Sequence, residues 1–455
     1  MKRRDRVRTD SPQTHPMDKI QNASLFDTVK FNLFHIVPYF LRGIFTKSRF
    51  WSVLLDTIHP DPLAVKFCQR LRAKYQTKYI FTYLIRNKSL LVFDDEGTKH
   101  VLDNSPFTYA DPDLKRMGMS HFQPNALTIS RGDEWKDRRR FNESVLDSEN
   151  LVHRNADTFL ETIRAETGAV LSRESGHLVW EDFDRLFKRI TLQVIFGTGA
   201  QTETGLTESL VRMMRESNRV FLLGKSKDFD AFYERVRTYL ANAEPASLSG
   251  RCSHAPSSTV TRQENQVPHW MFAMMETLAT NTLRALALIS AHPRVEERVR
   301  IQLARFGELS ASDIGSLKYL RGCLQDAMRL WPTTAILARL MLADDRLAGA
   351  TVPAKTQVII LNNFLHRDSE TQPFADRFAP EQWLESETDY HFNHLSNGQQ
   401  VCAGKYLALF LGTAVLAQFL QTRRYRLVRP ALDPLKPLPH SLNEFLIKLE
   451  RVPLY

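Results

Sequence analysis

The stretch Leu395-Ser-Asn-Gly398-Gln-Gln-Val-Cys402-Ala-Gly404 decides the fold of this chain, and it runs directly into an apolar segment that ends near Leu420. A single cysteine is most often a small buried hydrophobe. The setting of Cys402 indicates more, because Gly398 and Gly404 allow a sharp turn and a close approach of the backbone. The helix that we predict after Cys402 directs its N-terminal amides toward the sulfur, which favours the thiolate. Cys402 is therefore a candidate metal ligand.

An acid and an alcohol stand side by side in the apolar segment 270–290, within Ala273-Met-Met-Glu276-Thr277. Two charged residues of this segment, Glu276 and Arg284, make it a poor membrane-spanning helix. A carboxylate next to a hydroxyl can relay protons to a reacting group. A polar notch that hydrates a buried helix is the plainer interpretation of the same two residues.

Three further segments combine charged and aromatic side chains. In Asp326-Ala-Met-Arg329-Leu-Trp-Pro332, the acid and the arginine lie on one helical face and can pair. In Trp135-Lys-Asp-Arg138-Arg139, the guanidinium of Arg139 can form a bidentate contact with a carboxylate. The third segment is Phe378-Ala-Pro380-Glu381-Gln382-Trp383. Each segment, taken alone, is equally compatible with a solvated surface.

Together these segments resemble, in order and approximate spacing, the motifs of the cytochrome P450 superfamily, most nearly its bacterial type. The cysteine segment is similar to the loop Phe-x-x-Gly-x-Arg-x-Cys-x-Gly, with Leu395 and Gln400 in place of the phenylalanine and the arginine. The acid–alcohol segment resembles Ala/Gly-Gly-x-Asp/Glu-Thr, and Asp326–Arg329 resembles Glu-x-x-Arg. Trp135 and Arg139 match Trp-x-x-x-Arg. The resemblance extends from about residue 60 to the end of the sequence.

The resemblance implies a cofactor, haem b with its iron, and a role for each matched residue. Cys402 would be the axial thiolate, which favours cleavage of the O–O bond. Glu276 and Thr277 would act in oxygen activation, and Asp326 and Arg329 would form a structural anchor. The residues expected to hold the cofactor are Trp135, Arg139, Arg339, Gly398, Cys402 and Gly404.

Several departures from the family pattern leave alternatives open. Gln400 removes a cationic contact to haem, Asp326 is one methylene shorter than the expected glutamate, and Gln382 stands where an arginine belongs, although Arg377 could substitute. The resemblance favours a monooxygenase that inserts one oxygen atom from O2 into a hydrophobic small molecule. A haem-binding pseudoenzyme or sensor, or a peroxide-using haem enzyme, remains an alternative. The acid–alcohol pair favours the O2 route, because peroxide users need a proton relay less.

The expected fold is mainly α with small β-sheets, that is, the cytochrome P450 fold. We predict a disordered basic N-terminus over residues 1–22 and a single domain over 23–455. Strands are expected at 78–85 and 89–93 and in the β-rich region 335–365, and helices over most of 133–240, over 267–306 and over 317–330. The polar stretch 241–265 is expected to be a flexible surface loop.

The net charge of +10 and the pI of about 9.4 predict an anionic partner. Nucleic acid is the weakest candidate because no nucleic-acid-binding module is recognisable. No flavin or iron–sulfur module is recognisable either, so electrons from NAD(P)H are expected through a separate acidic ferredoxin-type protein. Such a donor would be steered to Lys136, Arg138 and Arg140. A monomer is expected.

The second anionic candidate is a membrane. The apolar segment 31–45 is too short to span a bilayer but could lie along its surface, and packing on the protein's own core is an equal expectation. Four distant cysteines, Cys68, Cys252, Cys323 and Cys402, argue against a disulfide framework and indicate a reducing compartment. We therefore predict a cytoplasmic protein that can be peripheral to the membrane.

Overall fold

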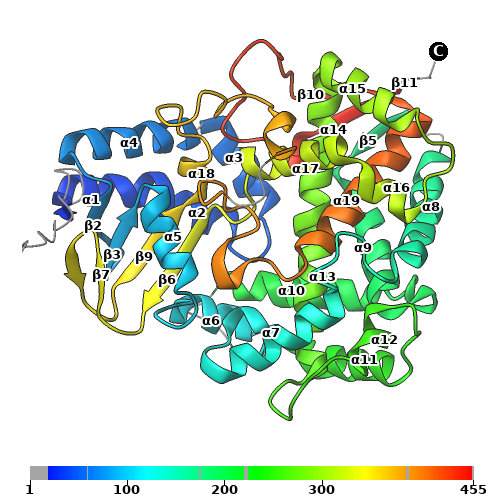
Figure 1. Cartoon of the computed structure of the whole chain (residues 1–455), viewed down its shortest axis with the longest axis horizontal. Coiled ribbons are helices and arrows are strands. Elements are labelled where there is room, and N and C mark those ends of the chain that lie inside the picture. The colour runs from blue at the N-terminus through cyan, green and yellow to red at the C-terminus, as the bar shows by residue number, and fades with distance from the viewer. Residues whose placement is uncertain (1–18, 59, 174–175, 220–223, 386–388, 453–455) are drawn as a thin grey trace, which may run out of the picture.

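The computed structural model describes residues 19–58, 60–173, 176–219, 224–385 and 389–452. Figure 1 shows a strand-rich part on the left and a helix-rich part on the right. Each part has its own hydrophobic core, and the helical one is the larger. The described chain is mainly helical with small sheets, as the sequence predicts.

Long helices that bury most of their surface form the helix-rich part. The chain places α19 (Lys405–Thr422) and α14 (Ala279–Ala291) at its centre, where nearly every side chain of α14 is buried. A helix that is apolar all round belongs in the interior. Around them lie α7 (Gly132–Leu146), α8 (Ala156–Leu171), α9 (Trp180–Phe196), α10 (Thr204–Ser217), α11 (Phe229–Ala241), α13 (Val267–Phe272), α15 (Pro293–Leu303), α16 (Ala311–Ser316) and α17 (Lys318–Leu330).

The main sheet has the strand order β1-β2-β3-β9-β6-β4. Its hairpin, β2 (Tyr79–Leu84) and β3 (Asn87–Val92), corresponds to the two strands predicted at 78–85 and 89–93. The β-rich region 335–365 supplies β6 (Ile336–Met341) and β9 (Gln357–Leu361), which pair antiparallel. The remaining strands are β1 (Gln21–Asn22), β4 (Tyr109–Ala110), β5 (His177–Val179), β7 (Asp345–Leu347), β8 (Ala350–Val352), β10 (Arg424–Arg429) and β11 (Lys448–Val452).

Helices from the N-terminal part cover the sheet. They are α1 (Leu25–Phe31), the π-helix η2 (Asn32–Ile36), α2 (Val37–Arg42), α3 (Arg49–Ile58), α4 (Pro60–Tyr75), α5 (Asp95–Asp103) and α6 (Asp113–Ser120). Among the described residues, none of the helices is long and apolar enough to cross a membrane.

The structure differs from the predicted boundaries in two places. Most of the predicted disordered segment 1–22 lies outside the described residues, but Gln21–Asn22 forms β1, which pairs parallel with β2. The predicted loop 241–265 contains a short helix, α12 (Leu248–Cys252). Leu248 and Cys252 are buried against the helical core, so this stretch is not a free surface loop. The stretch 241–265 is mostly polar, so its composition gave no sign that Leu248 and Cys252 anchor it to the core.

Candidate active site

The cysteine segment forms a tight loop in front of α19. Gly398 has φ +64, and a Cβ there would lie 2.3 Å from the main-chain oxygen of Leu102 in α5, so this position requires glycine. Gly404 has an ordinary φ of −94 and room for a side chain, and its backbone N–H donates to the sulfur of Cys402. The two glycines therefore differ: Gly398 permits the close approach, whereas Gly404 supplies a main-chain donor.

Cys402 differs from the other cysteines, which are all buried, because it is accessible to solvent. Surrounding protein nevertheless desolvates it and raises the pKa of its thiol, while the Gly404 amide and the charges of Arg139 and Lys405 lower it. The sulfur is therefore open to solvent on one side while protein surrounds the rest of it. A metal ion bound there would favour the thiolate further.

Arg139 fixes the main chain beside this sulfur. It lies on α7 and donates from Nη1 to the carbonyl oxygen of Val401 over 2.6 Å, while its Nε contacts Glu143 over 2.5 Å. Trp135, one turn earlier, is buried and meets Phe107 edge to face. The Trp135–Arg139 segment therefore lies next to the cysteine loop, although 262 residues separate Arg139 from Val401.

Arg339 and Gln400 converge on a carboxylate that the sequence did not single out. Arg339 lies on β6, with Nη1 3.7 Å from Asp111 and Nε donating to Ser105. The side chain of Gln400 also hydrogen-bonds Asp111, and these contacts together with Lys115 hold the pKa of that carboxyl below its usual value despite burial. A lone acid before a proline gives no sequence signal for this role.

The residues around Cys402 fit a haem. The set contains an accessible cysteine sulfur with a main-chain donor, and two arginines, Arg139 and Arg339, suited to carboxylates. The Oε1 atom of Gln400 is buried without a hydrogen-bond partner among the described residues. Gln400 can therefore still offer a polar contact where the family pattern has a cation.

The acid–alcohol pair lies on a π-helical turn, η6 (Ala273–Leu278), between α13 and α14. Such single wide turns occur frequently at functional sites. The carboxylate of Glu276 accepts a hydrogen bond from Thr46 over 2.9 Å, and burial raises the pKa of Glu276 to about 7. Cys402 lies in the loop directly before α19, and α19 packs against η6, the turn that carries Glu276 and Thr277.

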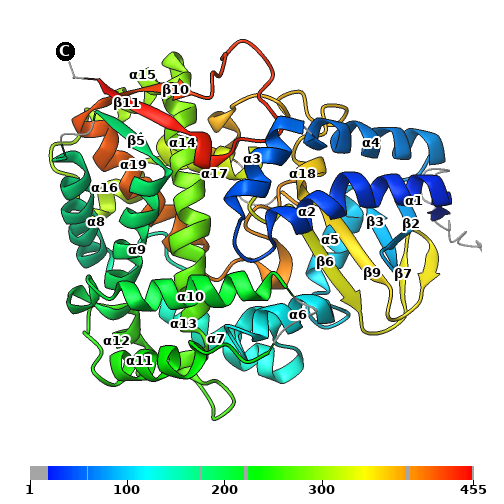
Figure 2. The same ribbon diagram turned by 180° about the vertical axis from the view of Figure 1, so that it is seen from behind.

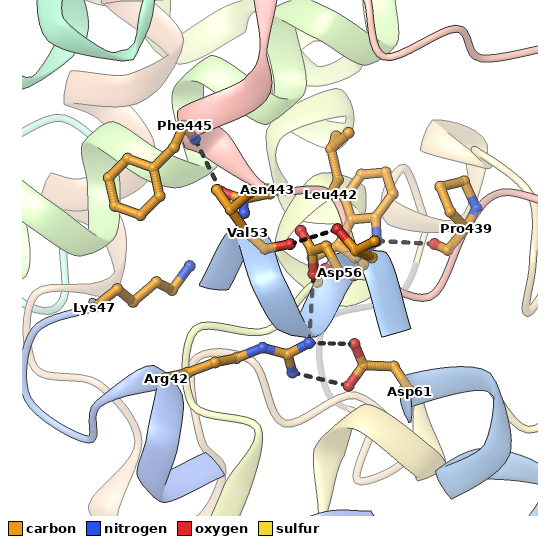
Figure 3. Close-up of polar contacts among 12 residues, drawn as sticks. Arg42, Lys47, Val53, Asp56, Asp61, Pro439, Leu442, Asn443 and Phe445 are labelled. Atoms are coloured by element: carbon orange, nitrogen blue, oxygen red, sulfur yellow. Dashed lines mark hydrogen bonds and ion pairs between the residues drawn. The ribbon is translucent and has the colours of Figure 1, made fainter. Parts of the chain in front are cut away.

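Glu276 and Thr277 line a cavity of about 310 Å³. Its apolar walls include Phe45, Val211 and Phe272, and its polar wall is built from ion pairs. Figure 3 shows one of them, in which Arg42 points at the carboxylates of Asp56 and Asp61, with Lys47 to one side. Arg42 lies 2.6 Å from Asp61 and 3.4 Å from Asp56. Lys47 and Arg284 both pair with Glu444, over 2.6 Å and 3.0 Å.

The loop between α2 and α3 brings Thr46 to Glu276. Asn218 clamps this loop, because its Oδ1 accepts from the amides of Ile44 and Phe45 and its Nδ2 donates to the carbonyl of Thr46. Gly43, at φ +96, permits the turn, since a Cβ there would lie 2.2 Å from the Thr46 carbonyl oxygen. Thr46 and Asn218 belong to the site, and sequence reasoning missed both.

Asp326 and Arg329 are fully buried and form an ion pair of 2.6 Å. Arg329 also donates to three main-chain carbonyls, those of His366, Ala375 and Arg377. Asp326 accepts from the Ala379 amide and from the Trp383 indole in η7 (Pro380–Trp383). Every charged atom of the pair therefore has a partner. Arg377 takes part through its main chain.

A second buried arginine, Arg367, reinforces the same region. It pairs with Asp376 over 2.7 Å and donates to the carbonyls of Leu330, Leu438 and Pro439. It therefore ties the end of α17 to the segment before β11. No local sequence pattern marks Arg367, because its partners are main-chain carbonyls and an aspartate nine residues away.

The cations predicted to receive an electron donor need correction. Arg138 is buried and bonds Ser130 and Glu134, so it cannot present charge at the surface. Lys136 and Arg140 are exposed, but each pairs with an acid of the same helix. The sequence of α7 contains four acids and four bases, so the helix has no net charge. Arg138 points inward, whereas Lys136 and Arg140, two residues before and after it, lie on the exposed side of the helix.

Comparison with known proteins shows similarity to one family. The family model described as Cytochrome P450 matches residues 253–449. Cyclooctat-9-en-7-ol 5-monooxygenase of Streptomyces melanosporofaciens is 25% identical over 293 residues, which are 57% of this chain and 63% of the relative. Pentalenene oxygenase of Streptomyces avermitilis is 29% identical over 224 residues, 48% of this chain and 50% of the relative. Cytochrome P450 4c3 of Drosophila melanogaster is 28% identical over 172 residues, which are 36% of this chain and 32% of the relative.

The chain thus spans between about a third and just under two thirds of these relatives. Their shared family carries haem iron, in agreement with the donor set around Cys402. Over residues 253–449 the chain is therefore similar to the cytochrome P450 superfamily.

Proposed function

We propose that this chain is a haem-thiolate monooxygenase that inserts one oxygen atom from O2 into a hydrophobic small molecule. The observation that carries the proposal is that the Cys402 loop leads directly into α19, the helix that packs against the η6 turn with Glu276 and Thr277. Haem bound to Cys402 would supply the activation of oxygen. The names of the two Streptomyces relatives, a monooxygenase and an oxygenase, support the same reaction class.

In this proposal Glu276 exchanges protons with the site. Its pKa of about 7 leaves both protonation states populated near neutral pH, which suits a group that must accept and donate a proton. Thr277 lines the same cavity and can pass a proton from its hydroxyl. The other carboxylates of the cavity, Asp56, Asp61, Asp184 and Glu444, each pair with a cation, so Glu276 is the acid best placed to change charge.

The apolar walls of the cavity support a hydrophobic substrate. Phe45, Val211 and Phe272 present aromatic and aliphatic surface beside Thr277. The two Streptomyces relatives are named for cyclooctat-9-en-7-ol and pentalenene. A small apolar molecule would bury its surface against these walls and keep its reactive carbon near η6.

A separate acidic ferredoxin-type protein delivers electrons from NAD(P)H in this proposal. Lys136 and Arg140 of α7, with Lys405 of α19, are the cations on the cysteine side that remain available. Their paired acids make long-range steering weak. The donor would therefore be recognised by short-range contacts at this surface.

The carbon monoxide spectrum of the reduced protein tests the proposal. Cys402→Ser should abolish the thiolate-type band and turnover, because a hydroxyl does not replace the thiolate. Cys252→Ala, at a buried cysteine of the helical core, is the matched control and should keep the band. A thiolate band that survives in Cys402→Ser would overturn the ligand assignment.

A haem-binding protein without turnover is the second candidate. The observation in its favour is that Arg339 already pairs with Asp111 and that Gln400 replaces a cation. This candidate predicts a thiolate-type spectrum with no product from any substrate when electrons are supplied chemically. Asp111→Asn, which frees Arg339, should then strengthen haem binding.

A further inference from the structure

An exposed apolar stripe runs along the first helical segment. Leu25, Val29, Leu33 and Val37 repeat every four residues, and all are exposed, Leu25 to 81%. On a regular α-helix this repeat would turn by about 40° at each step. The π-helix η2 between α1 and α2 has wider turns that oppose this rotation. The four side chains therefore stay on one side, while Phe31 packs into the core.

Helix α3 presents a second apolar side to solvent. Phe50 is 68% exposed and Ile58 62%, and the spacing of the exposed residues places them on one helical face. The opposite face contains Ser52, which is buried, and Asp56, and both line the cavity. The exposed large side chains are Phe50, Trp51, Leu54 and Ile58.

Figure 2 shows α1, α2 and α3 together on the side of the molecule that faces the viewer, and α2 contacts α3. The nine exposed side chains form what we call the apolar face: Leu25, Phe26, Val29, Leu33, Val37, Phe50, Trp51, Leu54 and Ile58. Soluble monomers rarely expose large apolar patches without an interaction to cover them.

Most of the net positive charge of the chain comes from the segment that contains this face. Residues 19–92 contain twelve Lys and Arg against three Asp and Glu, a net charge of +9 out of +10 for the whole chain. The three acids are all neutralised: Asp27 pairs with Lys74, and Asp56 and Asp61 pair with Arg42.

Several cations of this segment have no partner acid. Among the described residues, Lys30, Lys66, Arg86 and Lys88 form no ion pair. Lys30 extends over the ring of Phe26, at 4.1 Å from its centre, with its aliphatic stem along apolar surface. Apolar side chains bordered by unpaired cations are the arrangement of a surface that binds anionic lipid.

We propose that the apolar face docks on the surface of an anionic lipid bilayer. The nine apolar side chains enter the boundary between headgroups and acyl chains, and the bordering cations contact anionic headgroups. A second copy of the chain is a poorer occupant, because the two segments 19–92, each of net charge +9, would repel each other. The inference does not depend on catalysis. If the proposed function also holds, α3 separates the bilayer from the cavity, since its inner face lines the latter.

Vesicle binding by the full chain tests this. The protein is sedimented with vesicles of phosphatidylcholine alone or mixed with phosphatidylserine. We expect binding to the mixed vesicles, weakened by salt. The double variant Phe50→Ser/Ile58→Ser should raise the lipid concentration for half-binding roughly tenfold or more. The matched control, Ile301→Ser/Leu435→Ser, removes two exposed apolar side chains from other surfaces and should shift the lipid concentration for half-binding less than about twofold.

The fluorescence of Trp51 gives a second measurement of binding, and it can be made on the wild-type protein. Brominated lipids in the mixed vesicles should quench its fluorescence, and Trp51→Phe should remove most of that quenching. Equal binding by the Phe50/Ile58 variant and wild type would overturn the proposal. So would a dimer in solution that the same variant dissociates, which would show a second copy as the occupant. Vesicle binding does not require haem ligation by Cys402. If the carbon monoxide spectrum contradicted the proposed function, the vesicle experiment would therefore still decide this proposal.

Discussion

The Asp326–Arg329 pair and the Glu276 carboxylate are both charges inside the helical part, yet their surroundings differ. The pair is fully buried, and each of its charged atoms meets an opposite charge or a main-chain group. Glu276 lines a cavity, accepts a side-chain hydrogen bond from Thr46 and has a pKa of about 7. A completely paired charge holds a fold together, whereas an incompletely paired one keeps the freedom to exchange a proton.

The largest expected effect comes from breaking the paired region. Arg329→Ala leaves Asp326 as a buried charge without its partner, which typically costs about 3–5 kcal/mol of unfolding free energy. Arg298→Ala, which removes an exposed arginine from its 3.0 Å pair with Glu381, should cost about 0–1 kcal/mol. Denaturant unfolding of both variants measures the difference. Equal losses would mean that the pair at Asp326 is energetically an ordinary surface pair.

Removing the charge of Glu276 should have a smaller effect that depends on pH. Its folded pKa lies above the usual 4.5, so the carboxyl destabilises the fold as pH rises through about 7 and is neutral in both states below about 4. Glu276→Gln should therefore be more stable than wild type at pH 8, on the order of 2 kcal/mol, and nearly equal at pH 4. Thermal unfolding across this range is the measurement. A constant difference between the two proteins would contradict the raised pKa.

The smallest effect should come from the hydroxyl of Thr46. Its hydrogen bond favours the charged form of Glu276, so Thr46→Val should raise the pKa of that carboxyl by up to about one unit, and Thr46→Ser should restore it. The infrared band of the protonated carboxyl, assigned with Glu276→Gln, reports the titration.

Ser441→Ala is the control for that experiment, because Ser441 donates to another carboxylate of the same cavity, Asp56. The other charged groups facing Glu276 are Asp184 and Lys188 of α9 and Lys47 of the Thr46 loop, and all stay in place in these variants. If Thr46→Val and Ser441→Ala moved the band equally, the shift would reflect the cavity as a whole rather than one bond.

Local geometry made several features predictable from sequence alone. The strands around 78–93 follow from β-rich residues and a short turn, and β2 and β3 occupy these positions. The three-residue spacing of Asp326 and Arg329 places them on one helical face, whatever surrounds the helix. Gly398, Cys402 and the apolar run after them lie within one short stretch, so the loop before α19 could be recognised without knowing its neighbours.

Only the tertiary structure decided which distant groups meet. Thr46 and Glu276 are 230 residues apart, and Ile44 and Asn218 are 174 apart, so no local pattern marks their contacts. Burial of Arg138 and the meeting of Arg339 with Asp111 likewise depend on how helices and strands pack. The sequence determined the net charge of +10 and the presence of nine large apolar residues near the N-terminus. Folding decided that those residues share one exposed face, because helix phase and packing set which side of α1, α2 and α3 the core covers.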